Sequence, residues 1–137
     1  MNCTFKMRPS TPNHFHQSAL HKKAMDIFTL SQNLSGYFVH DLAPLRSNGT
    51  EDPNIYFTGD MMQQSVSLAP EILKAENEPF ADEKYKSAAT VIRLINLLYK
   101  TCERLEHVNS NGKDFLPILR SEIKKFRRLQ RTWMLTL

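Results

Sequence analysis

Residues 113–137 read KDFLPILRSEIKKFRRLQRTWMLTL, and this segment decides the fold class. At 100° per residue, its large apolar side chains fall on one face of a helix. They are Phe115, Leu119, Ile123, Phe126, Leu129, Trp133 and Leu137. A second face carries bases that lie within about 60° of one another. They are Lys113, Arg120, Lys124, Arg127 and Arg131, with Lys125 and Arg128 to one side. The pattern predicts an amphipathic helix with one buried face and one basic face.

The positive charge of the chain is concentrated in this predicted helix. Residues 113–137 contain seven Lys or Arg and two Asp or Glu, whereas the whole chain has 18 and 14 and a net charge of +4. The other residues are therefore close to neutral in sum. Helix faces that meet only solvent usually mix both signs. The single sign favours an anionic partner for this face over a merely solvated surface.

Composition places the chain among single-domain globular proteins. It has 137 residues, of which 41% are hydrophobic and 23% charged, which is enough for one core. Four glycines disfavour a turn-rich all-β fold. The sequence has no run of about 18 apolar residues and no apolar segment of a secretory signal near its start. Cys3 and Cys102 suggest no disulfide framework. We expect a cytoplasmic protein that does not contact a membrane.

Apolar residues recur at three- and four-residue steps in three further segments, which predicts helices there as well. With the C-terminal helix, the predicted ranges are 17–40, 58–78, 82–108 and 114–137. Pro70 should kink the second helix, because proline removes a backbone hydrogen bond. Asp82 is the expected N-cap of the third helix. Residues 109–112 should end that helix, since Gly112 is able to take positive φ. Between the first two helices, two prolines and an Asn-Gly pair predict a long loop.

The spacing also predicts which faces of the middle helices are buried. In the second helix two adjacent rows predict a broad buried face: Met61, Ser65, Leu68, Ile72 and Ala75, then Met62, Val66, Ala69 and Leu73. In the third helix the predicted stripe contains Tyr85, Ala88, Ile92, Ile95, Tyr99 and Cys102. Tyr99, Phe115, Phe126 and Trp133 are on apolar stripes, so we expect them in the core, or the last three at a subunit interface, and not stacked on bases.

Four helices with mostly short connections predict an all-α protein, an antiparallel up-down-up-down four-helix bundle. We assign residues 17–137 to this bundle. Residues 1–16 are polar and contain two prolines, so we expect a flexible N-terminal arm.

The third predicted helix carries a basic row of its own, opposite its apolar stripe. Its members are Lys86, Arg93, Lys100 and Arg104. In an antiparallel hairpin, this row and that of the C-terminal helix would merge into one surface roughly 25–30 Å long. Such a surface spans several phosphates and binds RNA or DNA with steep salt dependence and little sequence choice. Of the two nucleic acids, we favour RNA. Glu103 and Glu106 dilute the row.

No arrangement of residues indicates catalysis, a cofactor or a metal. His14 and His16 could join Cys3 or His21 on a metal ion, but no Cys-x-x-Cys or His-Glu-x-x-His spacing supports such a site. The gap between Arg104 and His107 is too short for the Arg…His motif of helical-bundle ribonucleases. Cys102 is interpreted as a small core residue. The sequence therefore favours a non-enzymatic protein.

Three segments carry a resemblance to a known family. They are SVSLAPEILKAEN at residues 65–77, INLLYK at 95–100 and RLQRTW at 128–133. In order and spacing, the chain from about residue 20 to its end resembles a family of small bacterial four-helix-bundle proteins. One branch is encoded in intervening sequences of 23S ribosomal RNA genes, and the other is the accessory variability determinant of diversity-generating retroelements. Arg128 and Trp133 keep the spacing of the second branch's closing motif, with Arg127, Arg131 and Thr132 at its glycine positions.

The resemblance to the retroelement branch implies a basic, barrel-like homopentamer that binds nucleic acid and a reverse transcriptase. It would assign Arg120, Lys124, Arg127, Arg128 and Arg131 to RNA or to an acidic surface of the reverse transcriptase. We rank this interpretation first: a non-enzymatic, homo-oligomeric accessory protein that binds nucleic acid. The alternative is an interaction bundle of the 23S branch, whose basic face meets an acidic protein. A nuclease is a remote third possibility.

Overall fold

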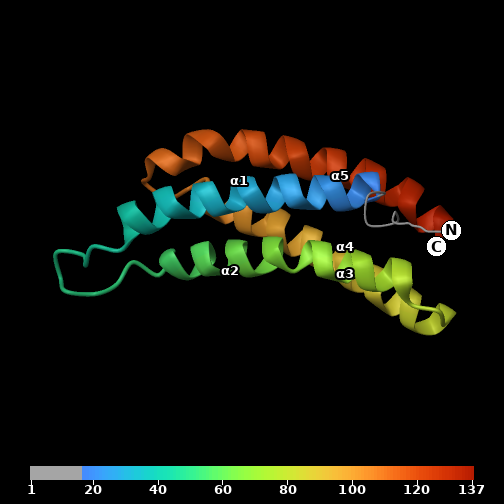
Figure 1. Ribbon diagram of the computed structural model, residues 1–137. Helices are drawn as coiled ribbons and strands as arrows, with labels where there is room; N and C mark the ends of the chain where they lie inside the picture. The colour runs from blue at the N-terminus through green and yellow to red at the C-terminus, as the bar shows by residue number, and fades with distance from the viewer. Residues whose placement is uncertain (1–16) are drawn as a thin grey trace, which may run out of the picture.

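The computed structural model describes residues 17–137, and all regular structure in this part is helical. The predicted all-α class and helical bundle are thereby confirmed (Figure 1). The arm predicted for residues 1–16 lies outside the described residues. The helices are α1 (Ala19–Leu42), α2 (Ile55–Val66), α3 (Leu68–Asn77), α4 (Ala81–Leu105), the 3₁₀ helix η3 (Asn111–Phe115) and α5 (Leu116–Thr136).

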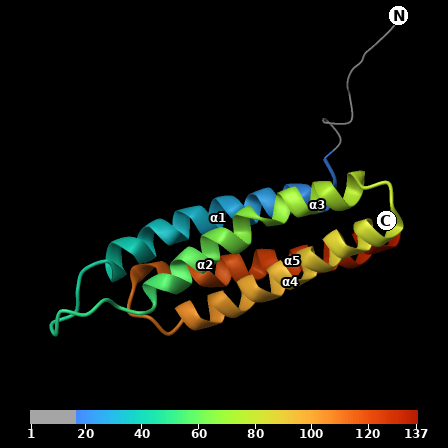
Figure 2. The same ribbon diagram turned by 90° about the horizontal axis from the view of Figure 1, so that it is seen from below.

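The helices lie side by side as long columns, with α2 and α3 together forming one of them (Figures 1 and 2). In Figure 1 the chain runs along α1, returns through α2 and α3, and then passes through α4 and α5 in the same alternating way. α1 packs against α2, α3 and α5, and α4 packs against the same three helices. The two helices that carry the predicted basic rows, α4 and α5, are therefore neighbours.

The second column is broken at Ser67, where the sequence predicted one kinked helix. Pro70 has no N–H to donate to the carbonyl of Val66, so the helical hydrogen bonds are interrupted there. The Gln63 carbonyl accepts hydrogen bonds from both the hydroxyl and the N–H of Ser67, at 2.8 and 3.3 Å. The predicted row from Met61 to Ala75 is buried across the break, but Val66 and Leu73 of the neighbouring row are exposed. The buried face is thus narrower than predicted.

Two details of α4 also differ from the prediction. Asp82 is not the N-cap, because α4 begins after Phe80. Asp82 lies in the first turn of α4, where its carboxylate interacts favourably with the helix dipole. Tyr85 and Ile92, predicted in the apolar stripe, are exposed. They lie beside the buried row rather than in it. Tyr99, seven residues after Ile92, is partly buried because it packs against the core. The Arg127 guanidinium lies 4.6 Å from the centre of its ring.

The connection between α4 and α5 is held against the end of α1. The Asp41 carboxylate accepts hydrogen bonds from the Ser110 hydroxyl at 2.6 Å and from the Asn111 N–H at 3.0 Å. Among the described glycines, Gly49 is the one at positive φ, 83°, so Gly112 does not use the conformational freedom that glycine offers at this position. A Cβ at Gly112 would lie 3.2 Å from the Phe38 ring and from the Tyr37 Cβ, so a larger residue would require these neighbours to shift by a few tenths of an ångström. Pro117 lies in the first turn of α5, where its missing N–H costs nothing.

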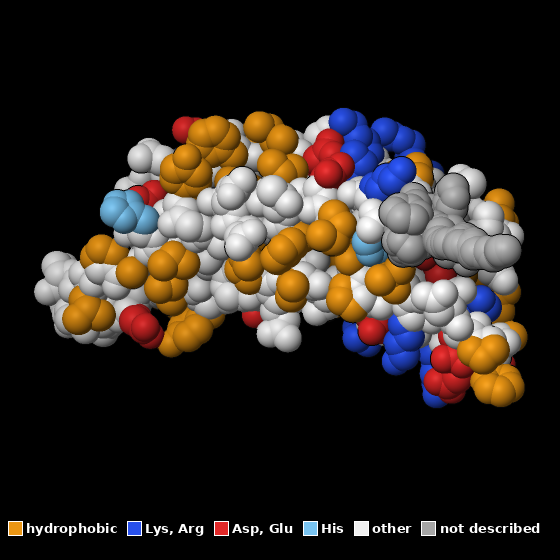
Figure 3. Space-filling view, in the orientation of Figure 1, with side chains coloured by type: hydrophobic (Ala, Val, Ile, Leu, Met, Phe, Trp, Pro, Cys, Tyr) orange, Lys and Arg blue, Asp and Glu red, His pale blue; other side chains and the backbone are white. Residues whose placement is uncertain are grey.

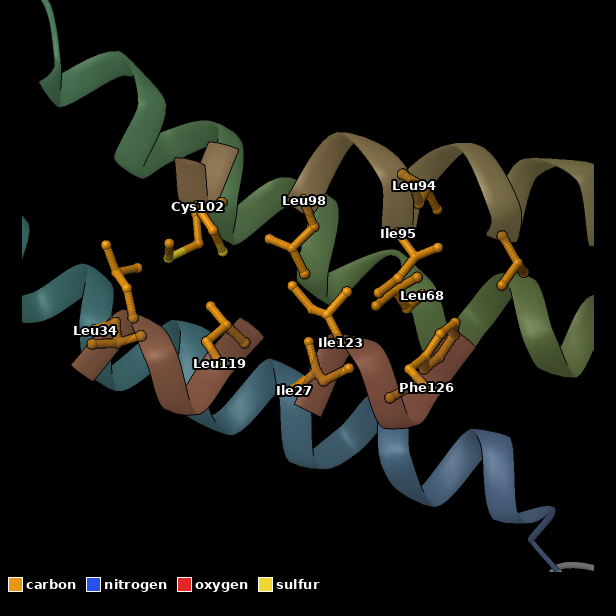
Figure 4. Packing of buried hydrophobic residues seen from close by; sticks show 14 of the residues in the cluster. Ile27, Leu34, Leu68, Leu94, Ile95, Leu98, Cys102, Leu119, Ile123 and Phe126 are labelled. Carbon is orange, nitrogen blue, oxygen red and sulfur yellow. The ribbon is translucent and has the colours of Figure 1, made fainter. Parts of the chain in front are cut away.

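The buried side chains of every column follow the 3.5-residue repeat of coiled coils. Six core positions per column alternate steps of three and four residues. They are Leu20, Ala24, Ile27, Ser31, Leu34 and Phe38 in α1; Thr58, Met61, Ser65, Leu68, Ile72 and Ala75 in α2 and α3; Ala88, Val91, Ile95, Leu98, Cys102 and Leu105 in α4; and Leu116, Leu119, Ile123, Phe126, Gln130 and Trp133 in α5. Figure 4 shows residues of all four columns meeting in this core.

Large and small core residues are combined along the bundle, as dense packing requires. Trp133 lies at the end of the bundle where α3 and α4 contribute Ala75 and Ala88. Its indole N–H also donates to the Glu76 carboxylate of α3 at 2.8 Å. Phe126 and Trp133 are therefore core residues, as predicted.

We expect the Phe126→Ala variant to lose about 3–5 kcal/mol of unfolding free energy, because a fully buried aromatic ring leaves a cavity. Urea unfolding followed by circular dichroism measures this loss. The Leu135→Ala variant is the matched control, since Leu135 is 88% exposed on the same helix. A loss below about 1 kcal/mol for Phe126→Ala would contradict the core packing.

Candidate nucleic-acid interface

The basic row of α4 is exposed along its whole length. Lys86 is 3.6 Å from Glu83 in a solvent-exposed ion pair, which leaves it largely free. Arg104 turns toward α2, where its guanidinium lies 4.8 Å from the centre of the Phe57 ring. Arg93 and Lys100 lie between these two positions and line a surface hollow. The row is therefore exposed on α4, as predicted. Arg93 and Lys100 in its middle line a hollow, whereas Lys86 and Arg104 at its ends contact Glu83 and Phe57.

The basic residues of α5 divide into paired and unpaired groups. Arg120 Nε is 2.8 Å from Glu106 Oε2 at the end of α4, and Lys125 donates to Glu122 at 2.9 Å. The exposed Lys124, Arg128 and Arg131 have no ion pair among the described residues. Charges already paired with a carboxylate attract a phosphate less, so Arg120 and Lys125 contribute less than the spacing suggested.

Arg127 is the fixed member of the α5 row. Its guanidinium donates to the Asn96 side-chain oxygen of α4 at 2.9 Å and lies over the Tyr99 ring. Both contacts hold the side chain across the α4–α5 boundary without neutralising its charge. The partial occlusion costs little because a guanidinium is weakly hydrated.

Two adjoining hollows lie along this boundary. The first, of about 380 Å³, is lined by Ala89, Ile92, Arg93, Asn96, Leu97 and Lys100 of α4. The second, of about 250 Å³, is lined by Ile92, Asn96, Arg127, Gln130, Arg131 and Met134. Because Ile92 and Asn96 line both, the hollows form one concave strip, which we call the α4–α5 strip.

The α4–α5 strip joins the two basic rows at their middle. It brings Arg93 and Lys100 of one row together with Arg127 and Arg131 of the other. No acidic residue is among the residues that line it in the described chain. Lys86, Arg104, Arg120, Lys124, Lys125 and Arg128 are not among its lining residues. The predicted surface is thus a compact group of four bases with further bases around it.

Figure 3 shows the face on which α5, α1 and the column of α2 and α3 lie, and charge and apolar surface separate along its α1–α5 part. Lys and Arg gather over the later part of α5, and hydrophobic side chains gather where α1 ends and α5 begins. There a hollow of about 660 Å³ is lined by Leu30, Asn33, Leu34, Gly36, Tyr37, His40, Phe115 and Ile118. The Tyr37 and Phe115 rings stack at 5.6 Å between centroids and are 51% and 43% exposed. Phe115 is therefore not a core residue. We call this surface the α1–α5 hollow.

Sequence reasoning missed the polar floor of the α4–α5 strip. Asn96 is three residues from Arg93 but was not considered, and Gln130 was hidden in the apolar stripe of α5. Gln130 takes a core position between Phe126 and Trp133 and is only 6% exposed. An amide at one step of an otherwise apolar heptad seam was the available signal.

The remaining reactive side chains offer little chemistry. Burial raises the pKa of the Cys102 thiol to about 12, so this cysteine is an inert core residue, as its position predicted. Within residues 17–137 no three His, Cys, Asp or Glu side chains form a group suited to a metal ion. His21 is buried on α1, while Cys3, His14 and His16, the other members of the considered metal set, lie outside the described residues.

Comparisons with protein-family models, curated proteins and solved structures give no match to this chain. In the part of the chain that the structure describes, no helix combines the length and the apolar character needed to cross a membrane.

Glu122 couples the basic helix to α1. Its carboxylate accepts hydrogen bonds from Lys23 at 2.8 Å and from Lys125 at 2.9 Å. The bond from Lys23, followed by that from Lys125, lowers the pKa of Glu122 below its ordinary value of 4.5. A lowered folded-state pKa means that the ionised carboxylate stabilises the fold. This contribution is complete above the unfolded-state pKa and is lost as the pH falls through the folded-state value.

We expect Glu122→Gln to lower the unfolding free energy by about 1 kcal/mol at pH 7. The difference from the unchanged protein should shrink as the pH falls below 4.5 and vanish once Glu122 is protonated in both states. Urea unfolding between pH 7 and pH 3 measures it, with the exposed Glu103→Gln as control. A difference that stays constant over this range would show that the Lys23–Glu122 bond does not stabilise the fold.

Proposed function

We propose that this up-down-up-down four-helix bundle is a non-enzymatic accessory protein that binds RNA through the basic residues of α4 and α5. The observation that carries the proposal is the α4–α5 strip, where two bases from each helix surround a concave surface without an acidic residue among its lining. Phosphate groups are the ligands that such a group of exposed bases attracts.

The surrounding bases extend the same surface. Lys124 and Arg128 are exposed on α5, and Lys86 and Arg104 lie toward the two ends of α4. A strand of RNA that crosses the strip would meet these charges on either side. Binding by such contacts positions the strand without reading its sequence.

The resemblance to the retroelement accessory family is consistent with this proposal. In that case, Arg120, Lys124, Arg127, Arg128 and Arg131 would hold an RNA template or an acidic surface of a reverse transcriptase. The 23S-type alternative would use the same bases for an acidic protein partner. RNA that fails to bind even at low salt would favour that alternative.

We expect Arg93→Glu combined with Arg131→Glu to weaken binding to a structured RNA by at least about tenfold at 100 mM salt. The plot of log K against log[salt] should also become less steep by about 1.4–1.8, because two phosphate contacts are lost. Fluorescence anisotropy over a salt series measures both quantities. Neither arginine is buried or hydrogen-bonded within the described residues, so the fold should be unaffected.

The matched control is Lys22→Glu with Lys74→Glu, which changes the net charge equally on exposed parts of α1 and α3. If the control weakens binding as much as the α4–α5 double variant does, the protein attracts RNA through its net charge alone. That outcome would exclude the α4–α5 strip as the interface.

The α1–α5 hollow supports the second part of the proposal, that the chain forms a homo-oligomer. Its lining contains no Lys, Arg, Asp or Glu among the described residues. The free energy falls when a partner buries exposed aromatic and aliphatic groups of this kind. Copies that meet through this uncharged surface can leave the bases of the α4–α5 strip exposed.

We expect the purified protein to be an oligomer by light scattering and the Ile118→Glu variant to be a monomer. A charge at Ile118 would have to be buried without a partner in the oligomer, which is costly. Leu45→Glu, in the exposed loop between α1 and α2, should leave the oligomer intact. A monomeric unchanged protein would contradict both the oligomer and the retroelement interpretation.

A further inference from the structure

We propose that the α4–α5 strip receives an unpaired nucleobase, so that the protein selects single-stranded RNA over duplex RNA. This inference rests on the proposed function and adds the class of nucleic acid that the site takes. It is carried by Gln130, whose position neither the fold nor simple phosphate binding explains.

Gln130 occupies a core position in which its amide nitrogen has no hydrogen-bond partner among the described residues. The residue is 6% exposed. Every other core position of α5 holds an apolar residue. A buried amide without partners destabilises a fold, so leucine or methionine would serve the bundle better. An external ligand with its own acceptors and donors would remove this cost.

The other buried polar atoms without a hydrogen bond belong to residues that do not line the strip: His21, Ser31, Ser35, Thr58, Glu106 and Arg120. Ser31, Ser35 and Thr58 carry hydroxyls that can rotate toward a carbonyl one turn earlier on their own helix. The amide of Gln130 is longer and planar, and the side chain lines the strip together with Asn96. Among the residues with such an atom, Gln130 is the one whose side chain also lines the α4–α5 strip.

Asn96 gives the strip a second amide. Its side-chain oxygen accepts a hydrogen bond from Arg127, and its NH₂ has no partner within the described residues. Asparagine and glutamine amides form paired hydrogen bonds with the edges of bases. Ile92 and Met134 line the same hollow and offer apolar surface to the faces of a ring.

The arrangement of charges suits a single strand. Arg93 and Lys100 lie on one side of the shared residues Ile92 and Asn96, and Arg127 and Arg131 lie on the other. A strand that crosses the strip can place phosphates on both sides while one base turns inward. In an RNA duplex the bases are paired and stacked, and the deep major groove keeps side chains from their edges. The phosphates of a duplex would therefore contact only the Lys and Arg side chains at the edges of the strip.

The test compares three RNA probes with the same number of phosphates: a mixed-sequence single strand, the same strand with abasic positions, and a hairpin duplex. Fluorescence anisotropy at fixed salt gives the three affinities. We expect the base-bearing strand to bind at least about tenfold more tightly than either of the other two. Equal affinities for all three probes would overturn the inference and leave the proposed function intact. Binding to none of them at low salt would overturn both.

The variant Gln130→Met separates the amide from the charges. Methionine has a similar length and suits the core, so we expect equal or higher stability. The preference for the base-bearing strand should fall at least about threefold, while the affinity for the abasic strand and its salt dependence should not change. Gln63→Met, on the exposed side of α2, is the matched control and should behave as the unchanged protein. If Gln130→Met keeps the full preference, the amide does not contact a base.

Discussion

The 3.5-residue repeat of buried side chains is the constraint on which the rest of this structure depends. Each column has six core positions along its length, so the helix axes must lie nearly in line with one another, whatever the chain direction. The same repeat determines which residues of each helix face the solvent. The break at Ser67 leaves the repeat unchanged, because Ser65 and Leu68 are still three residues apart and both buried. The missing hydrogen bond at Pro70 is therefore a local cost, while the seam continues from Met61 to Ala75. Packing across the bundle, rather than helix continuity, holds this column in place.

The same register sets what the surface can do. In α5 the core seam leaves two flanks: one turns toward α4 and carries Arg127 and Arg131, and the other turns toward α1 and carries Glu122. Ion pairs occupy the α1 flank and the beginning of α5, where Arg120 meets Glu106. The remaining bases near α4 keep their charge available. What distinguishes the α4–α5 strip is that its bases have no carboxylate partner among the described residues, and not how many bases it contains.

Sequence periodicity was sufficient for the helices, for most of the core and for the presence of two neighbouring basic rows. It failed where a tertiary contact decides the outcome. Gly112 has the Phe38 ring close to where a Cβ would lie and does not have a positive φ. Phe115 lies on the apolar stripe yet stacks on Tyr37 at the surface. No local pattern reports which bases find a carboxylate on another helix. The core position of Gln130 was likewise not predicted, because an apolar stripe is recognised by its apolar residues and Gln130 is polar.

The three faces of α5 have a consequence for how this sequence can diverge. One helix supplies a row of the core, half of the α4–α5 strip and part of the α1–α5 hollow. Nearly every position from Leu116 to Met134 is therefore committed to packing, charge or an apolar surface. The loop between α1 and α2, by contrast, is mostly exposed and lines neither the α4–α5 strip nor the α1–α5 hollow. Neutral drift and insertions should accumulate in that loop, while α5 changes slowly and mainly by paired substitutions.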